Sequence, residues 1–330
     1  MNKIFFVTMK IIAQTKRGKF YVKEKESGEE RFTLIADWQF FRGKIQPMEK
    51  LNFDDLKKSF LWSQQKGFIE EDSSIISVMV ARGKKHGLSP EESVLKSDYL
   101  PTSSSFRQII REEKIDALKH NQRDKAFQPL NCSGRTIYPI VDNLEHLKRL
   151  FDTGASLIQF RVKDKSQNDV FALVEKAVEV SKEYSFSKLI INDYWEAAIE
   201  SGAFGVHLGQ EDIKNADLST LRSSGLRLGI STHSFWEVSL ALLLSPSYIA
   251  CGPIFQTRVK KMPWLPQGIR NLSYWVRVLP KPLVAIGGIN LSNLESVKQT
   301  GVEIISLING ISCAVSPQQA YLTFKERWEE

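Results

Sequence analysis

Apolar runs of five to eight residues alternate with longer amphipathic segments from residue 137 onward. The amphipathic segments, such as HLKRLFDTG and DVFALVEKAVEVSKEY, carry apolar side chains every three or four positions, the period of an α-helix that packs on one face. Because parallel strands need crossover helices, eight such units predict an α/β fold, a closed (β/α)8 TIM barrel, with an open doubly wound sheet as the alternative. The eight predicted strands are residues 137–141, 156–162, 188–193, 205–209, 227–231, 248–255, 283–289 and 304–310.

The first 120 residues follow a different pattern. Alternating apolar and polar residues on either side of Ser27-Gly28 predict two strands joined by a turn. Residues 121–135 are polar and have no hydrophobic period. The pattern therefore predicts a small α+β module over residues 1–120, a linker over 121–135 and the barrel over 136–330. The helices predicted in the module are residues 53–65 after a cap at Asn52, residues 73–86, a helix that begins at Ser89-Pro90, and a helix from Ser103 to His120.

Composition and charge narrow the class of protein. The chain has 330 residues, 42% of them apolar and 25% charged, which is typical of a globular protein with a sizeable core. No apolar run approaches the roughly 20 residues of a membrane span, and the opening apolar segment, interrupted by Lys10, predicts a strand rather than a signal peptide. The three cysteines are far apart, which argues against a disulfide framework or a zinc site and favours a cytoplasmic protein.

The net charge of +7 lies mostly in the first part of the chain, where residues 1–130 hold 24 Lys and Arg against 18 Asp and Glu. Such a bias can attract nucleic acid or an acidic partner. The charges alternate in sign, as in KEKESGEER, and do not cluster into a basic stripe. A solvated surface is therefore the preferred interpretation, and binding to nucleic acid is not favoured.

Polar residues follow the predicted barrel strands where each apolar run stops. The carboxyl ends of the strands in a parallel barrel meet at one rim, and the active sites of this fold lie there. The sequence therefore predicts that residues distant along the chain gather at this rim. They are Arg161, Lys163, Asn192, Asp193, Asp212, Ser231, Thr257 and Lys260.

The charged rim residues allow two interpretations. Asp193 and Asp212 can share a Mg²⁺ ion, which prefers carboxylate and phosphate oxygens, and the ion can hold a diphosphate together with Arg161, Lys163 and Lys260. Alternatively, the same charges form salt bridges between loops. The spacing alone does not decide between the two.

A second anion site is predicted at the last two strands. Gly287 and Gly288 allow close approach of the backbone, and the loop at residues 308–310 lies where many barrels bind a phosphate. His207 lies inside an apolar run and is interpreted as a packed core residue, whereas His233 lies at the rim. No pair of nucleophile and base stands out, so the residues favour stabilisation of charge over covalent catalysis.

Seven segments occur in order along the predicted barrel. They are QFRVK (159–163), INDYWEAAI (191–199), GVHLGQED (205–212), LGISTHS (228–234), GPIFQT (252–257), KKMPWLPQG (260–268) and AIGGI (285–289). Together they resemble the thiamine phosphate synthase family over residues 135–325, in particular its enterobacterial type.

The resemblance implies a transferase of thiamine biosynthesis. It would join 4-amino-2-methyl-5-hydroxymethylpyrimidine diphosphate to 4-methyl-5-(2-phosphooxyethyl)thiazole, which gives thiamine phosphate and pyrophosphate. In the family the diphosphate leaves first, and the thiazole nitrogen captures the resulting pyrimidine-methyl cation. This route needs charge stabilisation and close placement of two rings, and it needs no base on the nucleophile.

The resemblance also implies roles for the matching residues. Asp193 and Asp212 would hold Mg²⁺, and Arg161, Lys163 and Lys260 would be the catalytic cations. The pyrimidine diphosphate would contact Gln159, Phe160, Arg161, Val162, Lys163, Asn192, Ser231 and Lys260. The thiazole phosphate would contact Thr257, Val259, Gly288, Ile308 and Asn309.

Three positions depart from the family pattern. One is Glu303, a carboxylate near the phosphate end of the barrel, which is expected to face solvent because it lies at a helix end. Val259 stands where the family has Thr, and losing one hydroxyl bond to a charged group costs roughly 1.5–3 kcal/mol. Asn309 replaces a common Ser, where the contact is mainly through the backbone. Two other functions stay open, namely a thiazole tautomerase-like enzyme acting through His233, and a non-catalytic sensor of a thiamine precursor. Asp193 and Asp212 argue against the tautomerase, which has no diphosphate to hold.

The amino-terminal module shows no function of its own. Residues 73–100 are faintly similar to the last helices of hydroxymethylpyrimidine kinase, but the Gly-Thr-Gly-Cys segment of such kinases is absent. A small interaction or dimerisation module is the preferred interpretation. The expected partners of the whole chain are therefore small-molecule substrates, and a homo-oligomer remains open.

Overall fold

The computed structural model describes residues 7–16, 18–25, 32–38, 41–45, 51–95, 126–132, 134–163, 166–256, 266–279 and 282–330. The contacts within the chain divide it into two compact units. The first comprises Met1–Lys119 together with Ser234–Leu244, and the second comprises His120–His233 together with Ser245–Glu330. The predicted domain and linker boundaries at residues 120 and 135 stay a prediction, because most of the chain around them lies outside the described ranges.

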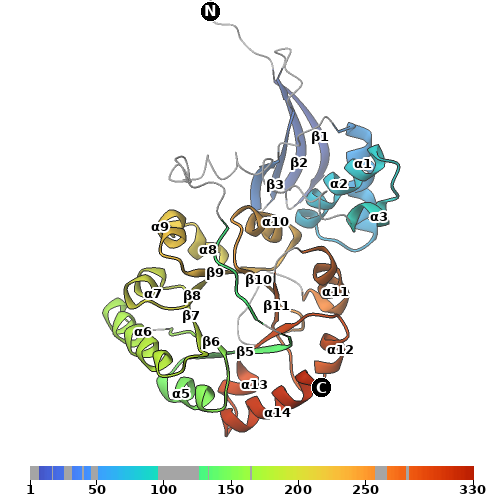
Figure 1. Ribbon diagram of the computed structural model, residues 1–330. Coiled ribbons are helices and arrows are strands. Elements are labelled where there is room, and N and C mark those ends of the chain that lie inside the picture. The colour runs from blue at the N-terminus through green and yellow to red at the C-terminus, as the bar shows by residue number, and fades with distance from the viewer. Residues whose placement is uncertain are drawn as a thin grey trace, which may run out of the picture. The chain divides into compact units, whose positions relative to one another are not determined.

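The first unit contains a four-stranded antiparallel sheet in the order β1-β2-β3-β4 and a group of helices beside it (Figure 1). The strands predicted on either side of Ser27-Gly28 correspond to β2 and β3. Asn52 caps the first helix by accepting hydrogen bonds from the backbone of Asp54 and Asp55. The elements are β1 (Val7–Thr15), β2 (Gly18–Lys25), β3 (Phe32–Trp38), β4 (Phe41–Ile45), α1 (Phe53–Gln65), α2 (Glu70–Lys85) and α3 (Pro90–Val94). The helix predicted from Ser103 to His120 lies outside the described residues.

Helix α2 forms the core of the first unit. Its residues from Ser73 to Arg82 are buried around the whole circumference of the helix. A further helix, α10 (Phe235–Leu243), follows a barrel strand in the chain but packs with this unit. The Asp72 carboxylate accepts a buried hydrogen bond of 2.7 Å from the backbone N–H of Phe235 in the first turn of α10. The sequence of α10, FWEVSLALL, is apolar on nearly all sides, which is typical of a helix that is buried all round.

The second unit is a closed parallel barrel with the strand order β10-β11-β12-β5-β6-β7-β8-β9 (Figure 1). All eight strands coincide with the predicted apolar runs, so the predicted TIM barrel is confirmed. The strands are β5 (Thr136–Val141), β6 (Leu157–Phe160), β7 (Lys188–Asn192), β8 (Gly205–Leu208), β9 (Arg227–Thr232), β10 (Tyr248–Cys251), β11 (Leu283–Ile286) and β12 (Ile304–Leu307).

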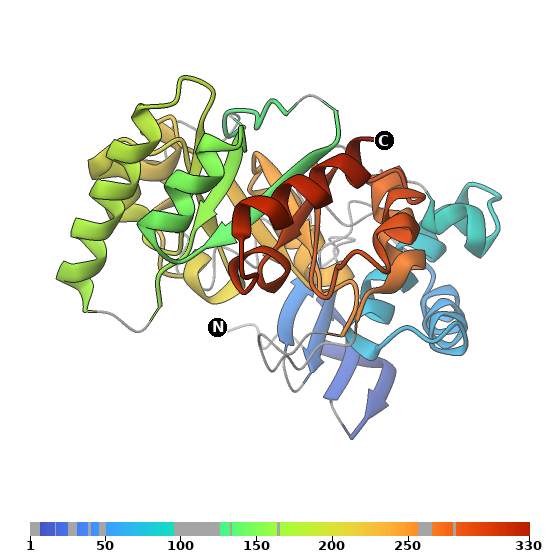
Figure 2. The same ribbon diagram turned by 90° about the horizontal axis from the view of Figure 1, so that it is seen from below.

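Helices cover the outside of the barrel strands. Helices α14 and α5 contact one another there, next to the strand β5 (Figure 2). The helices of this unit are α5 (Leu144–Asp152), α6 (Gln167–Lys182), α7 (Trp195–Ser201), α8 (Gln210–Ile213), α9 (Leu218–Ser223), α11 (Gly268–Val278), α12 (Leu294–Lys298), α13 (Asn309–Ser312) and α14 (Pro317–Glu329). No helix in the described part of the chain is long and apolar enough to cross a membrane.

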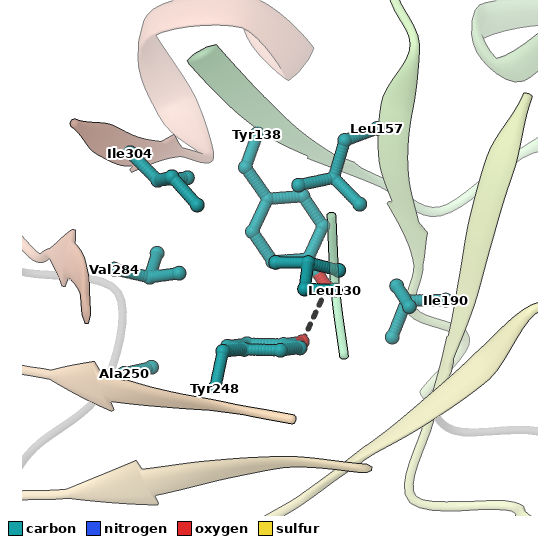
Figure 3. Packing of buried hydrophobic residues seen from close by; sticks show 8 residues of the cluster. All are labelled: Leu130, Tyr138, Leu157, Ile190, Tyr248, Ala250, Val284 and Ile304. Carbon is teal, nitrogen blue, oxygen red and sulfur yellow. Dashed lines mark hydrogen bonds between the residues drawn. The ribbon is translucent and has the colours of Figure 1, made fainter. Parts of the chain in front are cut away.

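Side chains pack the interior of the barrel. Seven strand residues and Leu130, which precedes the first barrel strand, form one buried cluster (Figure 3). Its members are Leu130, Tyr138, Leu157, Ile190, Tyr248, Ala250, Val284 and Ile304. Gly229 makes room for the ring of Tyr248, since a Cβ at position 229 would lie 2.0 Å from its Cζ atom. Absence of a side chain on β9 therefore lets an aromatic ring cross the barrel axis.

Candidate active site

The carboxyl ends of β6, β7 and β8 bring charged residues from three chain segments into one region. Asn192 at the end of β7 pairs with His207 on β8 in the parallel ladder. Lys163, beyond the end of β6, places its Nζ atom 2.9 Å from an oxygen of Asp193, directly after β7. Asp212 lies on the short helix α8 that follows β8. The predicted gathering of these residues at one rim is thus what the barrel geometry produces.

Asp193 has an unusual backbone conformation. Its φ of 65° lies in the left-handed region, which costs most residues roughly 1–2 kcal/mol and which Asp tolerates better than most. The backbone N–H of Asp193 donates to the carbonyl of His207 at 2.9 Å. This bond holds the residue against β8 while the chain turns sharply into α7. The turn aims the carboxylate toward Asp212 and Lys163 instead of along the strand.

The Asp193 and Asp212 carboxyl groups face each other. Desolvation is the largest cause that raises the pKa of Asp212, and the charge of Asp193 and a hydrogen bond to it raise this pKa further. The backbone N–H of Gly209, which donates to Asp212 at 3.2 Å, and the charge of Lys163 act in the opposite direction. Two carboxylates that disfavour each other's charge form a site where a cation is stabilising.

Asn192 carries an unsatisfied hydrogen-bond donor. Its side chain is 6% exposed, and its Nδ2 atom is buried without a hydrogen-bond partner among the described residues. Such a group costs about 1–3 kcal/mol, and buried amides are nearly always paired. The donor lies next to Asp193 at the strand end. An acceptor on a bound ligand would satisfy it.

Gln159, Phe160 and Val162 are buried in the protein. The Gln159 amide donates to the hydroxyl of Tyr138 at 3.0 Å, inside the barrel. Phe160 and Val162 are only 1% and 3% exposed. Their side chains belong to the core, so of these three residues the backbone is the part available to a ligand. Arg161, between Phe160 and Val162, is half-buried and lies close enough to His207 to act on its pKa.

Two glycines and a short helix shape the other end of the rim. Gly288 has a φ of 71°, and a Cβ there would lie 2.7 Å from the Cβ of Phe255 and 2.8 Å from the carbonyl oxygen of Gln256. The loop after β11 therefore packs tightly against the loop after β10. Ile308 and Asn309 follow β12 and begin helix α13. These are the positions predicted to meet a phosphate, and they lie at the carboxyl ends of neighbouring strands.

The sequence model of the thiamine monophosphate synthase family matches residues 136–311, more than half of the chain. The chain belongs to the thiamine monophosphate synthase family. Thiamine-phosphate synthase from Enterobacter sp. (strain 638) is 44% identical over 185 residues, which cover 56% of this chain and 87% of that protein. The thiamine-phosphate synthase of Escherichia coli O6:H1 is 46% identical over 179 residues, 54% of this chain and 84% of that protein.

A solved structure agrees with the sequence relatives. Thiamine phosphate pyrophosphorylase from Pyrococcus furiosus is similar with a TM-score of 0.52 and 26% identity, covering 58% of this chain and 94% of that chain. The predicted family and fold are confirmed. The predicted site residues stay predictions, because the relatives identify the family and not the role of each residue. Thr257, Val259 and Lys260 lie outside the described residues.

The described residues include two carboxylates that could supply part of the ligand set of a Mg²⁺ ion. No group of three or more His, Cys, Asp and Glu that could hold a metal occurs among the described residues. The pair Asp193 and Asp212 nevertheless fits Mg²⁺, which commonly takes one or two carboxylates and completes its shell with water and substrate phosphate. Burial and the charge of Asp193 both raise the pKa of Asp212, and a cation held between the two carboxylates would offset both effects.

His207, which the sequence indicated only as a core residue, contacts one of the predicted site residues. It is buried on β8, and burial lowers its pKa to about 4. Its Nε2 atom lies 2.8 Å from Oγ of Ser231, a predicted substrate contact on β9. The alternation of inward-facing positions along β8 and β9 is the signal in the sequence that would have paired them.

Proposed function

We propose that this protein is a Mg²⁺-dependent thiamine phosphate synthase that acts at the rim formed by β6 to β9. The observation that carries the proposal is the group of Lys163, Asp193 and Asp212, in which an ammonium lies 2.9 Å from one of two adjoining carboxylates. The family relationship supports the same reaction. Its substrates are the pyrimidine diphosphate and the thiazole phosphate.

The reaction requires the stabilisation of a leaving group. The C–O bond between the pyrimidine methylene carbon and the diphosphate breaks, and the diphosphate leaves with the electron pair. The thiazole nitrogen then donates its lone pair to the methylene carbon and forms the C–N bond. No proton has to be removed from the nucleophile, which agrees with the cations and carboxylates found at the described part of the rim.

The charged residues have separate tasks in this proposal. Asp193 and Asp212 would hold Mg²⁺, which when bound supplies positive charge to the diphosphate oxygens. Lys163, whose ammonium lies 2.9 Å from Asp193, would donate to the diphosphate oxygens. Arg161, half-buried at the same rim, adds the planar guanidinium that suits phosphate oxygens. Lys260 completes the set of catalytic cations by the resemblance.

Substrate position would depend on neighbouring uncharged groups. The Nδ2 atom of Asn192, which has no partner among the described residues, would donate to the pyrimidine diphosphate, and this bond would remove the cost of burying an unpaired donor. The thiazole phosphate would be held by backbone at Gly288 and at Ile308-Asn309, with Thr257 and Val259 from the loop after β10. Because the three cysteines lie far apart in the sequence and do not suggest a disulfide framework, we also assign the protein to the reducing cytoplasm.

Product analysis tests the proposed reaction. The full-length protein is incubated with both substrates and Mg²⁺, and thiamine phosphate and pyrophosphate are quantified by chromatography. The proposal predicts that the two products appear in equal amounts, and that omission of either substrate prevents the appearance of both. Isomerised thiazole without pyrophosphate would identify a tautomerase instead. Binding of the pyrimidine diphosphate without turnover would identify a sensor, and either result would overturn the proposal.

A further inference from the structure

Five polar side chains form a continuous hydrogen-bonded chain across the barrel interior. The Gln159 amide donates to the Tyr138 hydroxyl at 3.0 Å, and the hydroxyls of Tyr138 and Tyr248 are 2.8 Å apart (Figure 3). The Tyr248 hydroxyl lies 2.9 Å from Nδ1 of His207, and Nε2 of His207 lies 2.8 Å from Oγ of Ser231. The chain begins in the core and ends at the half-buried Ser231, at the site rim.

The direction of the protons in this chain follows from its buried end. Tyr138 accepts from Gln159, so its own proton needs an acceptor, and among the described residues only the Tyr248 oxygen offers one. Tyr248 then donates to Nδ1 of His207. A neutral imidazole that accepts at Nδ1 carries its proton on Nε2 and donates it to Ser231.

The opposite direction leaves a buried donor unpaired. If Ser231 donated to Nε2 of His207, Nδ1 would donate to Tyr248, and Tyr248 would donate to Tyr138. The Tyr138 proton would then have no acceptor among the described residues, although Tyr138 is almost fully buried. A doubly protonated imidazole has the same consequence for Tyr138. Buried hydrogen-bond donors rarely lack an acceptor, so the first direction is favoured.

We propose that His207 is a positioning residue that keeps the Ser231 hydroxyl turned outward as a hydrogen-bond donor to the diphosphate of the substrate. Ser231 accepts from His207, so its own proton is available at the rim. Phosphate oxygens only accept hydrogen bonds, so a serine that meets them must donate. Tyr248, Tyr138 and Gln159 fix the tautomer of His207 from the core side. This inference rests on the proposed function, in which Ser231 contacts the pyrimidine diphosphate.

A double-mutant cycle with His207→Leu and Ser231→Ala tests the inference. Loss of a hydrogen bond to a charged group predicts that His207→Leu lowers kcat/KM for the pyrimidine diphosphate by roughly 10- to 100-fold. The KM for the thiazole phosphate should not change. Because His207 acts through Ser231, the double variant should be no worse than Ser231→Ala alone. The inference would be overturned if the two substitutions lowered kcat/KM by factors that multiply in the double variant, or if His207→Leu impaired the use of both substrates equally.

Two further variants guard against a failure of His207→Leu to fold. His207→Gln keeps an amide N–H that can reach Ser231, so it should recover a large part of the lost kcat/KM. Tyr248→Phe removes one hydroxyl and leaves the ring beside Gly229, so the tautomer of His207 is no longer fixed. We expect a loss of roughly 3- to 10-fold in kcat/KM that disappears in the Ser231→Ala background.

The matched control is Tyr321→Phe, since Tyr321 is another buried tyrosine of the same unit, on helix α14. It should keep the activity of the unmodified protein. A protein that forms no thiamine phosphate before any substitution would contradict the proposed function. An active protein in which Tyr248→Phe behaves like Tyr321→Phe would contradict the positioning role alone.

Discussion

Asn192 offers a test in which activity and stability change in opposite directions. Its Nδ2 atom is buried and has no hydrogen-bond partner in the described part of the chain, and a buried donor without an acceptor costs about 1–3 kcal/mol. Asn192→Leu replaces the amide by an apolar group of similar shape, so it should raise the free energy of unfolding of the ligand-free protein by about 1–3 kcal/mol. For a unit of this size each kcal/mol shifts Tm by roughly 2–4 °C, so a rise of roughly 2–10 °C is expected.

The same substitution should weaken the binding of the pyrimidine diphosphate. Loss of the amide donor should raise the KM for the pyrimidine diphosphate by roughly tenfold, the value of one hydrogen bond to a charged acceptor. Differential scanning calorimetry of the ligand-free protein measures the first effect, and steady-state kinetics measures the second. The calorimetric comparison should follow the barrel transition, because the chain has two units and need not unfold in one step.

The matched control is Gln159→Met, a polar-to-apolar substitution at a site that is also buried. Gln159 donates to Tyr138 at 3.0 Å, so this change removes a bond that exists and should lower the free energy of unfolding by about 0.5–1.5 kcal/mol. The two substitutions should therefore change the free energy of unfolding in opposite directions. A lower Tm for Asn192→Leu, together with an unchanged KM, would refute the reasoning that Asn192 is kept for a ligand.

Four further predictions follow from the site. Lys163→Met should lower kcat/KM for the pyrimidine diphosphate roughly tenfold or more while stability changes by only about 0–1 kcal/mol, because this exposed ion pair is screened by water; kinetics and urea unfolding measure the two. Because the pKa of Asp212 is raised, its charge opposes folding at neutral pH, so Asp212→Asn should raise the Tm of the metal-free protein at pH 7 and lose this advantage at pH 4. Burial lowers the pKa of His207 to about 4, so as the pH drops below about 6.5 the unfolded chain binds a proton at this residue before the folded protein does. The free energy of unfolding should therefore fall by roughly 3 kcal/mol between pH 7 and pH 4, and by less in His207→Gln. Gly288→Ala should cost about 1–2 kcal/mol for the left-handed backbone alone and raise the KM for the thiazole phosphate; an unchanged Tm would contradict the crowding at this turn.

The barrel could be predicted because its strands are buried on both faces. Such strands appear as continuous apolar runs, and all eight matched, from β5 at Thr136–Val141 to β12 at Ile304–Leu307. The gathering of Lys163, Asp193 and Asp212 could be predicted as well, since each lies within three residues of the end of an apolar run and the fold collects such ends at one rim. The salt bridge between Lys163 and Asp193 is one of the two interpretations that the sequence left open.

The remaining features depend on contacts between distant segments. Tyr138 and Tyr248 are 110 residues apart, and their hydroxyls meet only because Gly229 leaves space for the second ring. His207 was correctly expected in the core, but its role depends on that pair. Helix α10 is apolar on nearly all sides (FWEVSLALL), unlike the amphipathic barrel helices, and its contacts with the first unit include the hydrogen bond from Phe235 to Asp72 and an edge-to-face contact between the rings of Phe68 and Phe235.

The most direct test of the central claim measures thiamine phosphate formation from both substrates while Mg²⁺ is titrated. The unmodified protein is compared with Asp193→Asn and with a control, Asp217→Asn, which alters a helix cap on α9 that Asn also suits. We predict Mg²⁺-dependent product in the unmodified and control proteins and a loss of roughly 100-fold or more in Asp193→Asn. Equal activity and equal Mg²⁺ dependence in all three proteins would contradict the assignment of the metal and diphosphate site to this rim.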